Sequence, residues 1–125
     1  MGQAVMIVDD SKTIRVQIKH VIKTQGFDVI EASNGAEAVE LYKTHHDRVF
    51  MMFLDINMPV MNGLEALEAL SKDESLSMPN VVVLTTEDSA SYVEQAKNFG
   101  AKGWIVKPYN TEKLLSAIKR FAPAA

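Results

Sequence analysis

The chain has 125 residues and carries 13 Lys and Arg against 16 Asp and Glu, which makes its formal net charge −3. An acidic balance gives no general electrostatic reason to bind nucleic acid or an anionic membrane surface. The chain contains no cysteine, which excludes disulfides and thiolate metal sites and agrees with a cytoplasmic location. No apolar run approaches the ~20 residues of a membrane helix, and we expect one domain whose core needs no structural metal.

The pattern of apolar residues predicts five short strands that alternate with helices. Three unbroken runs rich in Val, Ile, Met and Phe are typical of strands covered on both faces, so we expect them at the centre of a sheet. Asp28 interrupts a fourth run and Lys107 ends a fifth, so we expect these two strands at the edges of the sheet. In chain order the predicted strands are 4–8, 27–30, 49–54, 81–84 and 104–106.

Helix-period segments follow each of these strands. Gly26 can end the first helix, and Asn34 can start the second in a motif that resembles a capping box. Ser89 or Ser91 can cap the fourth helix, and Thr111 the fifth. The apolar stripes are Ile14, Ile18, Val21 and Ile22 in the first helix, Ala38, Val39 and Leu41 in the second, Leu64, Leu67 and Leu70 in the third, and Leu114, Leu115, Ile118 and Phe121 in the fifth.

Polar residues gather where the predicted strands end. Alternation of strands and helices with right-handed crossovers makes the sheet parallel, so the carboxyl ends of all strands lie along one edge. Ligands of open α/β sheets bind at that edge. The residues concerned are Asp9 and Asp10 after the first strand, Asp55 after the third, Thr85 and Thr86 after the fourth, and Lys107 after the fifth.

The three carboxylates in this group need compensation. One pair of like charges ~4 Å apart costs ~4 kcal/mol at an effective dielectric constant of about 20. A hard divalent cation with oxygen ligands answers this, and Mg²⁺ is favoured over zinc because the chain lacks Cys and suitably spaced His. Lys107 adds a second positive charge. Such a site suits phosphoryl transfer, with Asp55 as the nucleophile that becomes an aspartyl phosphate.

Four motifs at these strand ends, VDDS (8–11), LDINMPVMNG (54–63), LTTE (84–87) and VKP (106–108), resemble the receiver domain of two-component response regulators. The resemblance covers nearly the whole chain and is closest to the stand-alone chemotaxis receivers of the CheY type. It implies a single receiver domain over 1–125 without an effector domain. It also implies a three-layer doubly wound (βα)5 fold, flavodoxin-like, with strand order 2-1-3-4-5, for which CheY and flavodoxin are the standard examples.

The resemblance implies a role for each site residue. Asp55 is the phosphoacceptor, and Lys107 and Thr85 contact phosphoryl oxygens. Asp9, Asp10, Asp55 and the main-chain carbonyl of Asn57 hold Mg²⁺, for which Mn²⁺ can substitute. Pro108 follows Lys107, and the family often holds that peptide bond in the cis form.

The resemblance also implies a switch and residues that tune it. Phosphorylation draws Thr85 inward and lets an aromatic residue, here Trp104, turn inward, which alters a target-docking surface at 90–120. Asn57 and Glu87 match the chemotaxis type at positions that tune hydrolysis. Two departures stand out: the branched Thr86 replaces Ala or Gly and narrows access to the phosphoryl group, and Trp104 is bulkier than the usual Tyr or Phe.

The partners that follow from the resemblance are a sensor histidine kinase, such as a chemotaxis kinase, and a protein target such as a flagellar motor switch component. The short segment after the fifth helix leaves no room for a DNA-binding effector, and we expect a cytoplasmic monomer. The alternatives are a single-domain phosphorelay shuttle or a regulator of a non-chemotaxis target. A Mg²⁺-dependent phosphatase would need an acid where Asn57 stands, and a flavin carrier would need a phosphate loop in place of the acidic DDSKT.

Simpler explanations exist for single residues. An Asp after a strand can cap the next helix. Taken singly, Lys107 is typical of a solvated surface charge, Thr85 of a hydroxyl at a strand end, and Trp104 of packing. Lys12, Arg15, Lys19 and Lys23 form a basic stripe on the first predicted helix, typical of a solvated face. The stripe could also help to dock a kinase or phosphotransfer domain, because charge complementarity speeds encounter.

Overall fold

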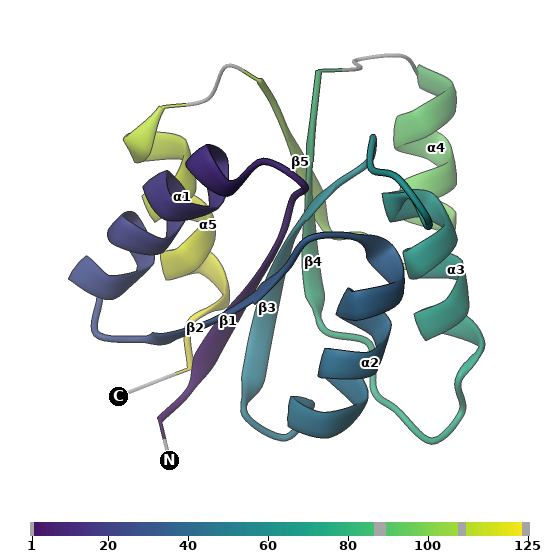
Figure 1. Ribbon diagram of the computed structural model, residues 1–125, viewed down its shortest axis with the longest axis horizontal. Coiled ribbons are helices and arrows are strands. Elements are labelled where there is room, and N and C mark those ends of the chain that lie inside the picture. Colours follow the sequence, from purple (N-terminus) through teal and green to yellow (C-terminus); the bar gives the residue numbers. More distant parts are fainter. Residues whose placement is uncertain (1, 87–89, 108–109, 124–125) are drawn as a thin grey trace.

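The computed structural model describes residues 2–86, 90–107 and 110–123. Five parallel strands form one sheet in the order β2-β1-β3-β4-β5, and a helix follows each strand (Figure 1). The strands are β1 (Ala4–Val8), β2 (Asp28–Ala32), β3 (Val49–Asp55), β4 (Asn80–Thr85) and β5 (Gly103–Val106). The helices are α1 (Lys12–Thr24), α2 (Gly35–His45), α3 (Gly63–Lys72), α4 (Ala90–Asn98) and α5 (Thr111–Phe121). The predicted strand order is confirmed, with β2 and β5 at the edges.

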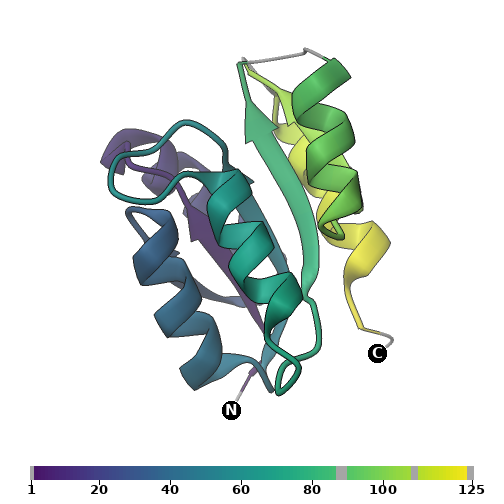
Figure 2. The same cartoon turned by 90° about the vertical axis from the view of Figure 1, so that its right-hand side faces the viewer.

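The helices cover both faces of the sheet. Helices α1 and α5 pack together on one face, and α2, α3 and α4 lie next to one another on the other face (Figures 1 and 2). Successive strand side chains point to opposite faces, so Met6 and Met52 join the core under α2 and α3, while Val5 and Phe53 join the core under α1 and α5. Burial on both faces explains why the central strands have no polar alternation.

The helix boundaries follow the predictions with one correction. Gly26 has φ +85° just beyond α1, and the Asn34 side chain accepts a hydrogen bond of 2.9 Å from the backbone N–H of Glu37 at the start of α2. Thr111 is wrong as the cap of the fifth helix, because Asn110 caps α5 and Thr111 is the first helical residue. Ser91 lies inside α4, and Ser89 lies outside the described residues. None of the described helices combines the length and hydrophobicity needed to traverse a bilayer.

Candidate functional site

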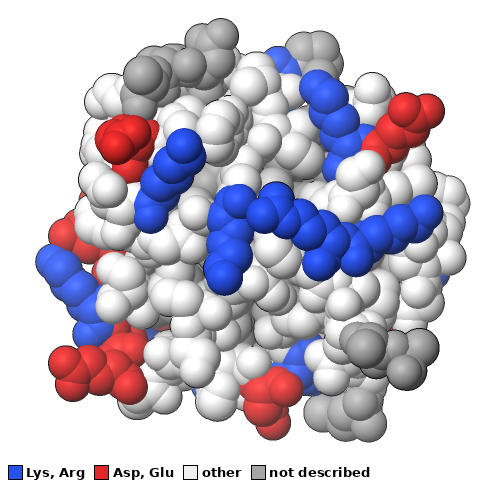
Figure 3. Space-filling view, turned by 180° about the vertical axis from the view of Figure 1, so that it is seen from behind, with Lys and Arg blue, Asp and Glu red and all other residues white. Residues whose placement is uncertain are grey.

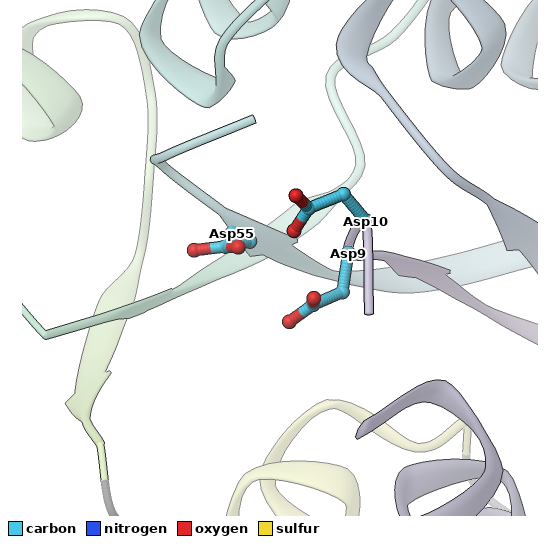
Figure 4. Close-up of side chains that lie close together, drawn as sticks. All are labelled: Asp9, Asp10 and Asp55. Atoms are coloured by element: carbon cyan, nitrogen blue, oxygen red, sulfur yellow. The ribbon is translucent and has the colours of Figure 1, made fainter. Parts of the chain in front are cut away.

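The carboxyl ends of two neighbouring central strands bring three aspartates together. Strand β1 pairs with β3, with Val8 opposite Leu54, so Asp9 and Asp55 each follow one member of a pair. Asp9 and Asp55 are 1% and 4% exposed, whereas Asp10 is exposed. One oxygen from each of the three carboxylates lies within 4.8 Å of the others. Figure 4 shows the three side chains lying close together, Asp9 and Asp10 from the segment after β1 and Asp55 from the end of β3.

Helix capping does not explain these aspartates. Ser11 caps α1 by accepting a 3.3 Å hydrogen bond from the N–H of Ile14, and Asn62 caps α3 in a reciprocal capping box with Glu65. Asp9 accepts a 2.9 Å hydrogen bond from the N–H of Ser11, which shapes the turn before the helix. The simpler explanation of the aspartates as helix caps is therefore wrong.

Lys107 reaches into the acidic group from β5, on the far side of β4. Its Nζ lies 3.1 Å from Oδ2 of Asp9 and 3.4 Å from Oδ2 of Asp55, and its side chain is only 19% exposed. The Lys107 N–H donates a 2.7 Å hydrogen bond to the carbonyl of Thr85, which holds the base of the side chain against the end of β4. The predicted meeting of Asp9, Asp10, Asp55 and Lys107 at one sheet edge is thus observed, although their chain positions span about a hundred residues.

Asp55 sits in an environment that opposes its ionisation. Burial, and next the negative charge of Asp9, raise its pKa from 3.8 to about 6, against the opposing effects of Lys107 and of a hydrogen bond donated by the Asn57 backbone. One lysine ammonium close to Asp9 and Asp55 therefore does not neutralise the group. At pH 7 Asp55 is still mostly ionised, so its carboxylate remains available as a nucleophile.

The group fits a hard divalent cation. Three carboxylates offer only oxygen donors, two of them are withdrawn from water, and the pKa of Asp55 records the electrostatic cost of leaving them uncompensated. Mg²⁺ prefers such oxygen donors and commonly uses one or two carboxylates together with water or phosphate oxygens. An acidic group of this kind is typical of the magnesium site of receiver domains.

The remaining predicted site residues surround this group to different degrees. Thr85 is the buried last residue of β4, one position beyond the pair formed by Asp55 and Leu84. Asn57 is exposed and Thr86 lies in an exposed bend after β4. The distance from the Thr85 hydroxyl to Asp55, and the roles expected of Asn57 and Thr86, stay predictions. Glu87 and Pro108 lie outside the described residues.

Trp104 lies on β5 with its side chain 43% exposed. The Nζ atom of Lys97 lies over the Trp104 ring, 4.9 Å from its centroid, and this cation–π contact joins α4 to β5. The cavity between Thr85, Trp104 and α4 has a volume of only about 10 Å³, which is room for about one water molecule. An indole that turned inward would need this cavity to widen, so the bulk of Trp104 opposes the expected inward turn, which stays a prediction.

Two residues near the site carry a function that the sequence patterns did not reveal. A Cβ atom built on Gly63 would stand 2.3 Å from the carbonyl oxygen of Asp55, so only glycine lets α3 begin this close to β3. Arg15, predicted to be solvated on a basic stripe, is only 16% exposed and donates a 2.7 Å hydrogen bond to the carbonyl of Asp9. The signal that could have indicated the role of Gly63 is its place directly after an N-cap residue. Arg15 contacts a main-chain carbonyl, and such a contact leaves no signal in residue types.

Comparison with known proteins agrees with this architecture. The model of the response regulator receiver domain matches residues 5–119. The chain is 36% identical over 121 residues to the chemotaxis protein CheY of Bacillus subtilis, covering 96% of this chain and 98% of the relative. It is 37% identical over 123 residues to CheY of Thermotoga maritima, with 96% and 98% coverage.

A solved structure of a relative extends the comparison. The complex of CheX, CheY, BeF3 and magnesium from Borrelia burgdorferi contains a chain that is 31% identical to this one, with a TM-score of 0.87 and coverage of 97% of this chain and 90% of that one. Receivers of this kind are not conventional enzymes. By its fold, its acidic group and these similarities, the chain belongs to the response regulator receiver domain family.

Proposed function

We propose that this protein is a single-domain signalling switch in which Asp55 accepts a phosphoryl group from a phosphohistidine of a sensor histidine kinase. The observation that carries the proposal is the convergence of Asp9, Asp10 and Lys107 on the buried carboxylate of Asp55. Lys107 taken alone would be explained as a surface charge, whereas the meeting of a lysine and two aspartates around one poorly solvated nucleophile would not. Family membership supports the choice of phosphodonor.

The chemistry follows from the positions of these side chains. A carboxylate oxygen of Asp55 attacks phosphorus, so that a P–O bond forms while the P–N bond of phosphohistidine breaks and its electron pair stays on the imidazole nitrogen. Asp9, Asp10, Asp55 and the main-chain carbonyl of Asn57 would hold Mg²⁺ or Mn²⁺, which supplies positive charge opposite the phosphoryl oxygens. The Lys107 ammonium, 3.4 Å from Asp55, is within reach of an oxygen on the transferred group. Thr85 would donate its hydroxyl to another.

The surface that responds is proposed to be α4, β5 and α5, which border the site through Thr85, Trp104 and Lys107. Residues 90–121 contain six Lys or Arg against two Glu, a net charge of +4, whereas the whole chain carries −3. Figure 3, seen from behind, shows Lys and Arg side chains running across this face. A protein target that docks there is expected to present acidic groups around an apolar contact for Trp104.

The output is proposed to be chemotaxis, through a kinase-linked partner or a flagellar motor switch component. Two curated relatives that match over nearly their whole length, at 36 and 37% identity, are chemotaxis proteins, whereas a sporulation initiation phosphotransferase of Bacillus subtilis matches over a similar length at only 27% identity, which favours this choice over a phosphorelay shuttle. The test is a binding measurement between the beryllofluoride-activated protein and the motor switch protein of its own organism. Tighter binding after activation is expected; binding that activation leaves unchanged would contradict the proposed target.

The phosphorylation step is tested with acetyl phosphate and Mg²⁺. We expect the intact mass to rise by one phosphoryl group, and the fluorescence of Trp104, the single tryptophan of the chain, to change. Asp55→Asn should abolish the mass gain, chelation should suppress it, and Asp47→Asn, a matched change at an exposed aspartate before β3, should leave it intact. Equal labelling of Asp55→Asn and wild type would refute the proposal, and turnover of many unrelated phosphate esters would favour a phosphatase instead.

A further inference from the structure

Arg15 occupies an unexpected environment on α1. It shares the polar side of the helix with the exposed Lys12, Lys19 and Lys23, yet its own side chain is only 16% exposed. Its Nη1 donates a 2.7 Å hydrogen bond to the main-chain carbonyl of Asp9, and its Nε donates a 3.1 Å hydrogen bond to Oε1 of Glu31. A side chain held by two hydrogen bonds is not free to dock a partner, so the surface that could do so consists of Lys12, Lys19 and Lys23 without Arg15.

The carbonyl that Arg15 holds belongs to the peptide bond between Asp9 and Asp10. The other parts of Asp9 are also held: its N–H donates to the carbonyl of Ala32 at 3.1 Å, and its carboxylate accepts from Ser11 and Lys107. Rotation of the Asp9–Asp10 peptide plane would break the bond to Arg15 and would redirect the side chain of Asp10. The direction of Asp10 therefore depends on the contact between Arg15 and the Asp9 carbonyl.

Glu31 sets the orientation of the arginine. It lies on edge strand β2 opposite Ile7 of β1, and its carboxylate takes Nε of Arg15 at 3.1 Å and Nζ of Lys19 at 3.5 Å. The guanidinium is planar and carries its donors in a fixed fork, so fixing Nε on Glu31 determines where Nη1 points. A lysine at position 15 could supply the charge but could not bond both partners in this geometry.

We propose that Arg15 and Glu31 are positioning residues that hold the Asp9–Asp10 turn ready to bind a divalent cation. The proposal rests on the cation site of the proposed function and adds two residues outside its ligand set. Groups that orient metal ligands without touching the metal typically change affinity by about 10- to 100-fold when removed. We expect a loss of Mg²⁺ affinity of about tenfold for Arg15→Met and a smaller loss for Glu31→Gln, whose neutral amide oxygen holds Nε of Arg15 more weakly than the carboxylate does.

The test is calorimetric titration of the folded protein with Mg²⁺, with unfolding by urea measured in parallel. Lys19→Met is the matched control, because it removes a positive charge from the same helix and from the same glutamate but does not touch Asp9; its Mg²⁺ dissociation constant should stay within about twofold of wild type. Arg15→Lys separates geometry from charge. If Arg15→Lys raises the Mg²⁺ dissociation constant as much as Arg15→Met does, the result supports positioning by the guanidinium. If Arg15→Lys binds Mg²⁺ as tightly as wild type, the charge alone is enough and the proposal is overturned.

A second measurement makes the result independent of the metal. Amide hydrogen exchange of residues 10 and 11 in the metal-free protein should quicken in Arg15→Met and Glu31→Gln but not in Lys19→Met. Lower stability with unchanged exchange and unchanged Mg²⁺ affinity would overturn the proposal and leave a purely structural ion pair. If wild type itself binds no Mg²⁺, the proposed function fails, and the exchange data alone decide whether Arg15 holds the turn. If Arg15→Met does not fold, Glu31→Gln carries the same test.

Discussion

Ionisation of Asp55 should destabilise the metal-free protein, and Asp55→Asn should remove that penalty. The pKa of the folded carboxyl is about 6, against 3.8 for an ordinary aspartate, so the folded state holds the proton more tightly than the unfolded chain does. The penalty is absent below about pH 4, grows between about pH 4 and pH 6, and is complete above pH 6. At about 1.4 kcal/mol for each pKa unit, it amounts to about 3 kcal/mol.

Little of this figure is lost to screening, because the side chain of Asp55 is only 6% exposed. Urea unfolding in the presence of a chelator should therefore give Asp55→Asn a free energy of unfolding that exceeds wild type by up to about 3 kcal/mol at pH 7.5 and by almost nothing at pH 4. Asp10 is exposed, so Asp10→Asn should change stability by less than about 1 kcal/mol.

Excess Mg²⁺ supplies the second half of the experiment. A ligand that binds only the folded state stabilises it, so Mg²⁺ at pH 7.5 should raise the stability of wild type more than that of Asp55→Asn and narrow the difference between them. A variant that is less stable than wild type at pH 7.5, or a difference that is the same at pH 4 and pH 7.5, would refute the electrostatic reasoning. The first result would mean that the Lys107 ion pair outweighs burial and the charge of Asp9, and the second that it balances them.

Three further changes test the geometry of the site. Gly63→Ala should lower the free energy of unfolding by about 2 kcal/mol or more, because its Cβ would stand 2.3 Å from the Asp55 carbonyl, whereas Gly103→Ala meets no atom within 4 Å and should be far milder in the same urea titration. Lys107→Met should raise the pKa of Asp55 above about 6, measured by carbon NMR of its carboxyl group, and an unchanged pKa would deny the ion pair. Val60→Gly should stabilise the protein by about 1 kcal/mol, because a β-branched residue at φ +68° is strained and its 84% exposed side chain packs little; a loss of stability would show an unrecognised contact.

The central strands were predictable because burial on both faces leaves a signal in residue type. The sequence pattern predicts strand β2 one to two residues early, because Asp28 interrupts the apolar run although it opens the strand. In the structure Asp28 pairs with Arg48, which lies just before β3, so its charge is compensated at the edge of the sheet. A partner twenty residues away cannot be read from the local pattern.

The cap of α5 shows a different limit. Asn110 and Thr111 are adjacent and both residue types cap helices well, so the sequence alone does not choose between them. The extended backbone at Asn110 and the hydrogen bond from the Lys113 N–H to its side chain decide the matter in the structure. An error of one residue of this kind leaves the fold unchanged, because the apolar stripe of the helix keeps its register.

The charged site itself was predictable, whereas the contacts that hold it in place were not, and the reason is chemical. Side chains that react or bind ions are polar or charged, and the Asp, Lys and Thr residues of this site stand out at the ends of apolar strands. The holding contacts act on the main chain: Arg15 on the carbonyl of Asp9, the missing Cβ of Gly63 against the carbonyl of Asp55, and the Lys107 N–H on the carbonyl of Thr85. Main-chain anchors fix where the carboxylates point without neutralising them.

The difference between main-chain contacts and ion pairs matters because a cation binds best where the protein's own positive charges do not neutralise the carboxylates. If ion pairs alone positioned the carboxylates, the pKa of Asp55 would fall below its usual value, and the affinity for a cation would fall with it. Instead the pKa is raised, so the metal-free fold bears the cost of the buried like charges, which a bound cation can relieve. Holding Asp9 beside Asp55 therefore lowers the stability of the metal-free fold, and a cation bound between the two carboxylates would restore it.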